Sequence, residues 1–472
     1  MKFFEKVANI FPEVRGPSEK RLGFKVKLKW TLLILVAFFV LSIIPLFGLG
    51  QNALAQFESL SIILGASFGS IMSLGIGPIV TASIVLQLLT GSGILKIDTT
   101  TPDGKIFFQG LQKVMTVFFI VFEAFIYVFL GGLAPAADLL GTSSYLVMQF
   151  TLVFQLILGG FMVLYMDQVI NKYGFGSGVS LFIAAGVSSS IFVRALSPLN
   201  SIGSWAFSSG QAPIGQVWVF FQSLMGRNPL GAALALAAIL ATIFIFLFAV
   251  YAQSMKIQIP LSFGRVRGHG MRWPLNFLYT SNIPVILTAA LLANIQLWAR
   301  LLENWGKPIL GTFAGNTPSS GLVAWIYPPN LVHGMITGSL AGIDIAHAIV
   351  YMVLMVGGAV LFSVFWVQTA GMDAAAQAKK MMASGLQIPG FRRDPRVLES
   401  ILNRYIPALT IMGGATVGFL AAFADLSGAL SRGTGILLTV MIIYKLYEDI
   451  AKQHAYDMHP ALRKFMSPEN SP

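Results

Sequence analysis

The chain has 472 residues, of which 56% are hydrophobic and only 11% are charged, and its mean hydropathy is +0.75. A water-soluble fold carries roughly 25% charged residues and cannot hide so much apolar side chain, so the composition indicates an integral membrane protein. The chain has no cysteine, which excludes disulfides, thiol nucleophiles and thiolate metal ligands, and its five histidines offer little material for a metal cluster.

Ten apolar segments are long enough to cross a bilayer as helices, which takes about 20 residues each. In chain order they lie near 30–50, 76–93, 110–133, 143–166, 177–196, 231–253, 281–301, 345–368, 406–424 and 433–450. The first begins too far into the chain, and is too long, for a cleaved signal peptide. Before it, the apolar residues of 1–11 recur at helical spacing and predict an amphipathic helix on the membrane surface.

The basic residues predict the orientation of these spans. Ten crossings put both termini on one side, and that side then holds all but five of the 31 lysines and arginines. The exceptions are Arg194, Arg227, Arg300, Lys307 and Arg432. Since Lys and Arg accumulate on the cytoplasmic side of membrane proteins, we expect cytoplasmic termini in a multi-pass plasma-membrane protein.

Residues 59–95 contain no charged side chain, and this stretch is too long for one span and too short for two. Gly75 and Pro78 interrupt it, and the part before them is rich in glycine, alanine and serine. The pattern predicts a re-entrant half-helix from the outer side, followed by a full span from Ile76. A single long helix kinked at proline is the alternative.

The spans divide into two halves of five, 1–200 and 201–472. Pro78 and Pro284 interrupt the second helix of each half near its start, and paired interruptions point to a functional centre between two repeats. An odd number of helices per half would make the repeats inverted. The predicted fold is thus an all-α polytopic membrane protein with ten helices in two pseudo-symmetric, inverted halves and a re-entrant segment.

The predicted membrane interior is poor in charge. Glu123, midway along the third span, is the clear exception. The centre is lined instead by Ile76, Val80, Ile283 and Ile286, which would close a pore by excluding water, although ordinary helix packing explains them equally well.

The sequence gives little support for a catalytic site or a cofactor site. The sequence has no phosphate-binding Gly-x-x-x-x-Gly-Lys-Ser/Thr run, and we expect no cofactor. Ser177 with His347 as base would suggest an intramembrane serine protease, but the two are predicted on opposite sides of the membrane. We therefore predict that the protein is not an enzyme.

Two long basic loops are predicted on the cytoplasmic face, at 254–280 and 369–405. The first alternates apolar residues and turns at glycines, which predicts a projecting hairpin whose tip carries Arg265, Arg267 and Arg272. Basic residues of the second are Lys379, Lys380, Arg392, Arg393, Arg396 and Arg404. Such loops could grip a polyanion, of which structured RNA is the obvious cytoplasmic example. The alternative is positive-inside bias with contact to lipid headgroups.

Five stretches resemble one known family. They are SLGIGPIVTASIVLQLL (73–89), NKYGFGSGVSLFIAAGV (171–187), SNIPVILTAALLANIQLW (281–298), FRRDPRVLESILNRYIP (391–407) and GTGILLTV (433–440). In this order and spacing they are similar to the SecY family, the large subunit of the protein-conducting channel, in its archaeal form. The resemblance runs almost end to end. It implies an hourglass of two five-helix halves with a lateral opening toward lipid.

The resemblance also implies roles for particular residues. The family's ring of apolar pore residues corresponds to Ile76, Val80, Val179, Ile183, Ile286 and Leu438. Its lateral gate, between the spans that start at Ile76 and near Asn282, has a polar cluster corresponding to Thr81, Glu123 and Asn294. Its plug corresponds to about 59–71, including Leu64, Gly65, Ser67, Gly69 and Ser70, and its ribosome-contacting loops to Arg265, Arg267, Arg392 and Arg393.

The resemblance implies a passive channel that moves unfolded chains across the membrane and transmembrane segments sideways into lipid. The implied partners are the single-span SecE/gamma and Sec-beta subunits, signal sequences, nascent polypeptides, and the translating ribosome as the energy source. A secondary transporter for a small solute is the alternative, because it shares inverted repeats and broken helices. It would need a polar site at the membrane midplane.

Overall fold

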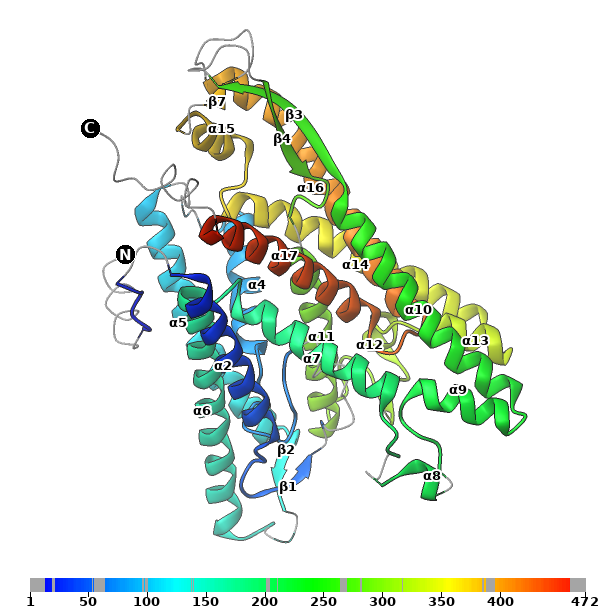
Figure 1. The fold of residues 1–472 in the computed structure, drawn as a ribbon. Helices are drawn as coiled ribbons and strands as arrows, with labels where there is room; N and C mark the ends of the chain where they lie inside the picture. The colour runs from blue at the N-terminus through cyan, green and yellow to red at the C-terminus, as the bar shows by residue number, and fades with distance from the viewer. Residues whose placement is uncertain are drawn as a thin grey trace.

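The computed structural model is a bundle of long helices with small sheets at its ends (Figure 1). It describes residues 13–18, 22–52, 54, 64–95, 97, 101–136, 138, 140–200, 204–209, 211–263, 270–280, 282–315, 317–383, 386–387 and 395–458. The expected amphipathic helix over 1–11 lies outside these residues.

In the part of the chain that the structure describes, ten long helices occupy the predicted spans. They are α2 (Phe24–Ile43), α4 (Gly77–Gly91), α5 (Pro102–Phe129), α6 (Ser143–Tyr173), α7 (Gly178–Leu196), α10 (Pro229–Ser254), α11 (Ile283–Asn304), α14 (Gly342–Thr369), α16 (Pro395–Leu426) and α17 (Gly433–Met458). Five of them agree with the prediction to within three residues at both ends, whereas α2, α5, α6, α16 and α17 differ by 6 to 11 residues at one end or both. Among the described residues, eight of them are long and apolar enough to cross a membrane, all except α4 and α17. The protein is therefore a multi-span membrane protein.

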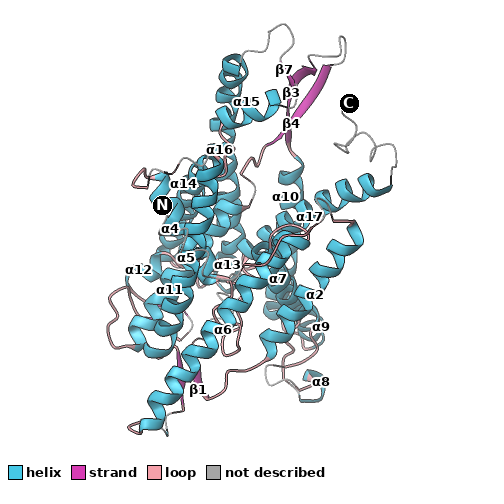
Figure 2. Ribbon diagram, turned by 90° about the vertical axis from the view of Figure 1, so that its left-hand side faces the viewer, coloured by secondary structure: helices cyan, strands magenta, loops and turns pink. Residues whose placement is uncertain are grey.

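Short helices and strands connect the long helices. The remaining elements are β1 (Leu49–Asn52), β2 (Leu133–Pro135), α8 (Ala206–Ser209), α9 (Gln216–Met225), β3 (Lys256–Phe263), β4 (Gly270–Asn276), β5 (Phe313–Ala314), β6 (Thr317–Pro318), α12 (Gly321–Trp325), α13 (Leu331–Thr337), α15 (Ala374–Ala383) and β7 (Leu386–Gln387). The β3–β4–β7 sheet and α15 project from one end of the bundle, and β1, β2 and α8 lie at the other (Figures 1 and 2). The expectation of an all-helical chain holds for the bundle and not for its ends.

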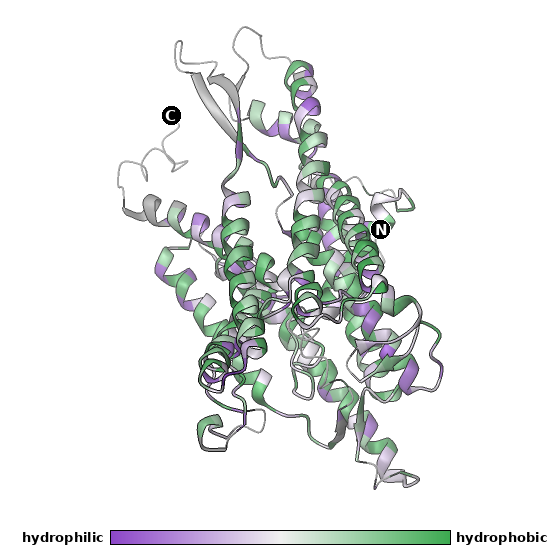
Figure 3. Cartoon of the chain, turned by 90° about the vertical axis from the view of Figure 1, so that its right-hand side faces the viewer, coloured by the Kyte–Doolittle hydropathy of each residue, from purple (hydrophilic) through white to green (hydrophobic). Residues whose placement is uncertain are grey.

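The surface of the bundle is apolar, as a bilayer requires. Helix α10 exposes Leu236, Leu240, Phe244 and Leu247, whereas most of α11 is enclosed by other helices. Apolar residues predominate along the helices of the bundle (Figure 3). The amide of Gln453 in α17 donates to the carbonyl of Leu22, just before α2, at 2.8 Å. The start of the first long helix and the end of the last therefore lie side by side.

The first basic loop is a hairpin, as the alternating pattern predicts. Strands β3 and β4 pair antiparallel from Lys256–Asn276 to Ser262–Gly270. A strand from the second basic loop, β7, pairs with β3 through Phe263 and Leu386. The second loop is shorter than predicted, because α16 begins at Pro395 and carries Arg396 and Arg404.

The re-entrant segment is not helical where the structure describes it. Residues 64–76 form successive turns, in which Gly65, Gly69 and Gly75 have positive φ. A helix cannot continue through left-handed positions, so the prediction of a half-helix is wrong for residues 64–71. Residues 59–63 lie outside the described part.

Candidate functional site

A cavity of about 530 Å³ lies among the long helices at the end that faces the β3–β4–β7 sheet. Helices α4, α5, α6, α7, α11 and α14 form its walls. Polar side chains line much of it: Ser83, Gln87, Gln109, Gln112, Asn171, Ser177 and Ser180. The cavity is thus a polar-lined space within an otherwise apolar bundle.

Three of the six predicted ring residues, Val80, Val179 and Ile286, line the same cavity. The other three, Ile76, Ile183 and Leu438, are almost completely buried in the core that Val80 and Ile286 also join. The six residues come from four segments of the chain, and five of them belong to this one core cluster, against which Val179 packs.

The three predicted gate residues form one hydrogen-bonded cluster. The side-chain amide of Asn294 (α11) donates to the hydroxyl of Thr81 (α4) at 3.0 Å. The hydroxyl of Thr81 lies 3.1 Å from Oε1 of Glu123 (α5), to which it can donate. All three are buried, with Glu123 only 2% exposed. The cluster therefore joins α4 and α5 to α11 through polar groups within an apolar interface.

Two of the expected plug residues, Leu64 and Gly65, lie against Ile76. The amide of Ile76 donates to the carbonyl of Leu64 at 2.8 Å, and a Cβ on Gly65 would lie 3.6 Å from Ile76 and from Phe182. Backbone groups in the turns are satisfied by α2 and its following loop: Leu46 donates to Gly69 at 2.9 Å. Irregular backbone at this depth is tolerated because protein covers it.

Phe68, in the same turns, connects this segment to α5 and α11. Its ring meets Tyr127 of α5 edge-on at 6.4 Å, and it packs with Phe313 around Ala293 of α11. A separation of α5 from α11 would therefore break some of the contacts that hold the Phe68 ring.

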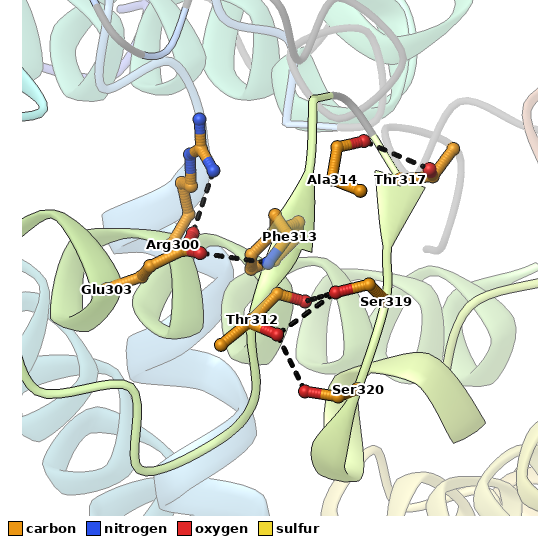
Figure 4. A network of polar contacts seen from close by, with 8 residues as sticks. All are labelled: Arg300, Glu303, Thr312, Phe313, Ala314, Thr317, Ser319 and Ser320. Atoms are coloured by element: carbon orange, nitrogen blue, oxygen red, sulfur yellow. Dashed lines mark hydrogen bonds and ion pairs between the residues drawn. The ribbon is translucent and has the colours of Figure 1, made fainter.

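A polar network fixes Phe313 from outside (Figure 4). Arg300 donates to Glu303 at 2.7 Å, and the other oxygen of Glu303 accepts from the amide of Phe313 at 2.9 Å. The guanidinium of Arg300 lies 5.4 Å from the centre of the Phe313 ring. The hydroxyl of Thr312 bonds the hydroxyls of both Ser319 and Ser320 across the base of the β5–β6 hairpin.

The predicted docking arginines, Arg265, Arg267, Arg392 and Arg393, lie outside the described residues. The pairing of β7 with β3 nevertheless brings the two basic loops together at one end of the bundle. Lys379 and Lys380 of α15 lie at the same end.

Sequence reasoning missed the polar lining of the cavity. Ser83 and Gln87 are four residues apart in α4, and Gln109 and Gln112 three apart in α5, so each pair shares one helix face. The side chains of Gln112 and Ser83 bond each other at 2.7 Å. A polar stripe on two otherwise apolar helices was the available signal.

Comparison with known proteins identifies the family. The SecY family model matches residues 70–447, and the model described as the plug domain of Sec61p matches residues 36–69. The chain belongs to the SecY family. The protein translocase subunit SecY of Methanothermobacter thermautotrophicus is 44% identical, over 98% of each chain. That of Pyrococcus furiosus is 43% identical, over 96% of each.

Solved structures of SecY relatives share the fold. One titled as the structure of a protein conducting channel has a TM-score of 0.82 and 40% identity, and the match covers 97% of this chain and 99% of that one. Sec61 in the canine ribosome-channel complex from the endoplasmic reticulum has a TM-score of 0.80 and 39% identity, with the same coverage.

Proposed function

We propose that this protein is the central pore-forming subunit of a protein-conducting channel. It moves unfolded secretory polypeptides across the membrane and releases transmembrane segments sideways into lipid. The observation that carries the proposal is the sequence of environments along one path. The polar-lined cavity leads to the apolar ring, and the ring lies beside an interface that Thr81, Glu123 and Asn294 join by hydrogen bonds.

In this proposal all ten long helices cross the membrane. Eight of them are long and apolar enough by themselves, and α4 and α17 are the other two. The ten helices form the inverted halves 1–200 and 201–472, and the end with the β3–β4–β7 sheet is cytoplasmic. This orientation is supported by the lysines and arginines, of which only five fall on the other side.

The ring acts as an adaptable gasket. Ile76, Val80, Val179, Ile183, Ile286 and Leu438 offer only apolar surface to a passing chain, so they close around side chains of many shapes without specific bonds. In the resting state they exclude water and ions, and the plug, about 59–71, seals the path below them. The contact of Leu64 and Gly65 with Ile76 supports this arrangement.

The lateral gate lies between α4 and α11. Because its polar groups can exchange partners with water or with an arriving peptide, separating the helices costs little in unpaired groups. An apolar segment in the pore then meets lipid directly and partitions into it.

The chain's proposed partners follow from its relatives and its basic loops. A relative is a ribosome-bound channel by its title, and the paired basic loops form a surface that suits ribosomal RNA. We propose that the ribosome docks there through Arg265, Arg267, Arg392 and Arg393 and drives the chain. The small subunits SecE/gamma and Sec-beta complete the complex.

A solute transporter is the alternative, and Glu123 is the side chain it would need. Its Oε1 is within hydrogen-bond distance of Thr81, in a cluster that joins helices rather than lining the described cavity. If Glu123→Gln abolished all transport, the solute hypothesis would be favoured. If charge reversal of Arg265 and Arg267 released ribosomes, the channel would be favoured.

The absence of native cysteine allows a direct test. Ile286→Cys is combined with a ribosome stalled on a secretory chain that carries one cysteine, and disulfide crosslinking is measured in membranes. We expect a crosslink over a short window of nascent-chain lengths, which would place the polypeptide in the ring. If a folded complex with its partners gave no crosslink at any length, Ile286 would be an ordinary helix-packing residue. The solute-transporter hypothesis would then be favoured.

A further inference from the structure

Two aspartates hold corresponding places in the bundle. Asp167 lies in the last two turns of α6 and Asp425 next to the end of α16, and each accepts a hydrogen bond from the start of the helix that follows. We infer that they are a pair of positioning residues, one in each half, that hold the two helices on which Val179, Ile183 and Leu438 stand. The inference rests on the proposed function of the ring.

Asp167 acts at the start of α7. Its Oδ1 accepts from the amide of Val179 at 2.9 Å, and its Oδ2 accepts from the side chain of Asn171 at 3.0 Å. A Cβ on Gly178 would lie 2.7 Å from Oδ1, so the glycine is what allows the approach. Ser177, which precedes α7, makes no capping hydrogen bond with its own side chain. The cap therefore comes from a different helix.

Asp425 acts in the same way at the start of α17. Its Oδ1 accepts from the amide of Thr434 at 2.9 Å, and its Oδ2 accepts from the hydroxyls of Thr434 and, at 2.6 Å, of Tyr351 in α14. A Cβ on Gly433 would lie 2.1 Å from the carbonyl carbon of Ala424, so here too the preceding helix presses on a glycine. One carboxylate thus ties α14, α16 and α17 together.

The local sequences are similar but differ in register. Helix α7 begins at the last residue of Gly176-Ser177-Gly178 and α17 at the first residue of Gly433-Thr434-Gly435, and the aspartates precede their amide partners by 12 and 9 residues. Each carboxylate lies toward the C-terminal end of its own helix, where the helix dipole disfavours negative charge. Each faces the N-terminus of the next helix, where the dipole favours it. Each carboxylate therefore stabilises the start of the following helix rather than the end of its own.

The two helix starts that the aspartates cap carry residues of the proposed ring. Val179 and Ile183 lie in the first two turns of α7, and Leu438 in the second turn of α17. Helices α7 and α17 pack together, with Gly435 against Val187. They run in opposite directions (Figure 1), so the two carboxylates fix the pair from its two ends. If either cap is lost, the first turns loosen and the gasket opens on that side.

The test is the ion leak of the resting channel complex in lipid vesicles. We expect Asp167→Ala and Asp425→Ala each to raise the leak about tenfold, which is the change in an open-to-closed ratio that 1.4 kcal/mol produces. In the same variants, Leu438→Cys should react faster with a water-soluble thiol reagent. This second readout follows the ring itself, since Leu438 is 0% exposed in the closed protein.

Asp344→Ala is the matched control. Asp344 also caps a helix start, accepting from the amide of Ala341 at 3.0 Å, but α14 carries no ring residue. If an alanine variant fails to assemble, the asparagine variant of the same position is compared with Asp344→Asn. A leak no greater than that of the control overturns the inference.

Ile286→Ala separates this inference from the proposed function. If Ile286→Ala leaks while the assembled aspartate variants do not, the ring seals the channel and the aspartates do not position it. If Ile286→Ala does not leak and the wild-type complex moves no polypeptide, the proposed function is wrong, and the inference that rests on it is overturned with it.

Discussion

The interface between α4 and α11 and the interface between α14 and α16 are held together in different ways. Across the first, the side-chain amide of Asn294 donates to the hydroxyl of Thr81, which also lies within hydrogen-bond distance of Glu123 in α5. The second relies on close approach at glycines: a Cβ on Gly418 would lie 2.9 Å from both the carbonyl oxygen of Met355 and the Cβ of Ala359. Small residues that let helix backbones approach are typical of permanent contacts in membranes.

The difference predicts which of the two interfaces separates more easily. Close packing loses its tight contacts as soon as the helices separate, and mobile lipid chains replace them only in part. A polar cluster keeps much of its bonding if water or another chain supplies partners. Opening is therefore less costly between α4 and α11, beside the ring, than between α14 and α16.

The packed interface gives the largest expected effect. Gly418→Val places a branched side chain against the backbone of α14, and overpacking of this kind costs roughly 3 kcal/mol. We expect a clear fall in the thermal unfolding temperature of the purified complex. Gly357→Val is the control, because a Cβ there, on an exposed face of α14, meets no atom within 4 Å. Equal effects of the two variants would show that helix propensity, not packing, is measured.

The gate interface gives a smaller and different effect. Thr81→Val keeps the shape of the side chain but leaves Asn294 and Glu123 without the hydroxyl that joins them. Unpaired buried groups cost about 1–3 kcal/mol, which disfavours the closed gate without weakening the bundle. We expect faster translocation of a precursor with a weakened signal sequence, at nearly unchanged unfolding temperature.

Ser83→Ala is the control for the gate. Ser83 lies on the same helix and bonds Gln112 of α5, so its hydroxyl contributes nothing across the α4–α11 boundary. An increase of the same size in Ser83→Ala would mean that any polar loss in α4 loosens the channel, and the comparison of interfaces would fail.

The sequence predicts the interior of the long helices well, because apolar length depends only on local composition. Helix α10 was expected at 231–253 and spans Pro229–Ser254. The first span was predicted too late, at 30–50, whereas α2 is Phe24–Ile43 and includes Lys25, Lys27 and Lys29. Long basic side chains reach the interface from within a helix, so charge marks the edge of the apolar core rather than the end of the helix.

The gate cluster and the turns after Leu64 show the limit of such prediction. Thr81, Glu123 and Asn294 were named through resemblance, and their hydrogen bonds join residues up to 213 positions apart, which no local pattern contains. Their role in gating stays a prediction. The half-helix over 64–71 was predicted from apolar composition, but the positive φ of Gly65 and Gly69 decides the backbone there. The carboxylate caps of α7 and α17 also depend on contacts between separate helices.

The smallest expected effect lies outside both interfaces, where Glu13 ties the segment before α2 to the end of α6. Its carboxylate bonds Lys172 at 2.5 Å and lies 3.7 Å from Lys113. The hydrogen bond from Lys172 is the main reason that the pKa of Glu13 is lowered from its ordinary value.

A lowered pKa means that the pair stabilises the attachment above the ordinary pKa of a glutamate, about 4.5, and that this contribution is lost as the pH falls through the lower folded value. Since Glu13 is half exposed, we expect less than about 1 kcal/mol. The measurement is proteolytic release of the segment as a function of pH and of salt. Glu13→Gln should release it equally at every pH. A wild-type pH profile in that variant would show that a group other than Glu13 carries the pH dependence, because the remaining bond between the amide of Val14 and Gln168 does not titrate.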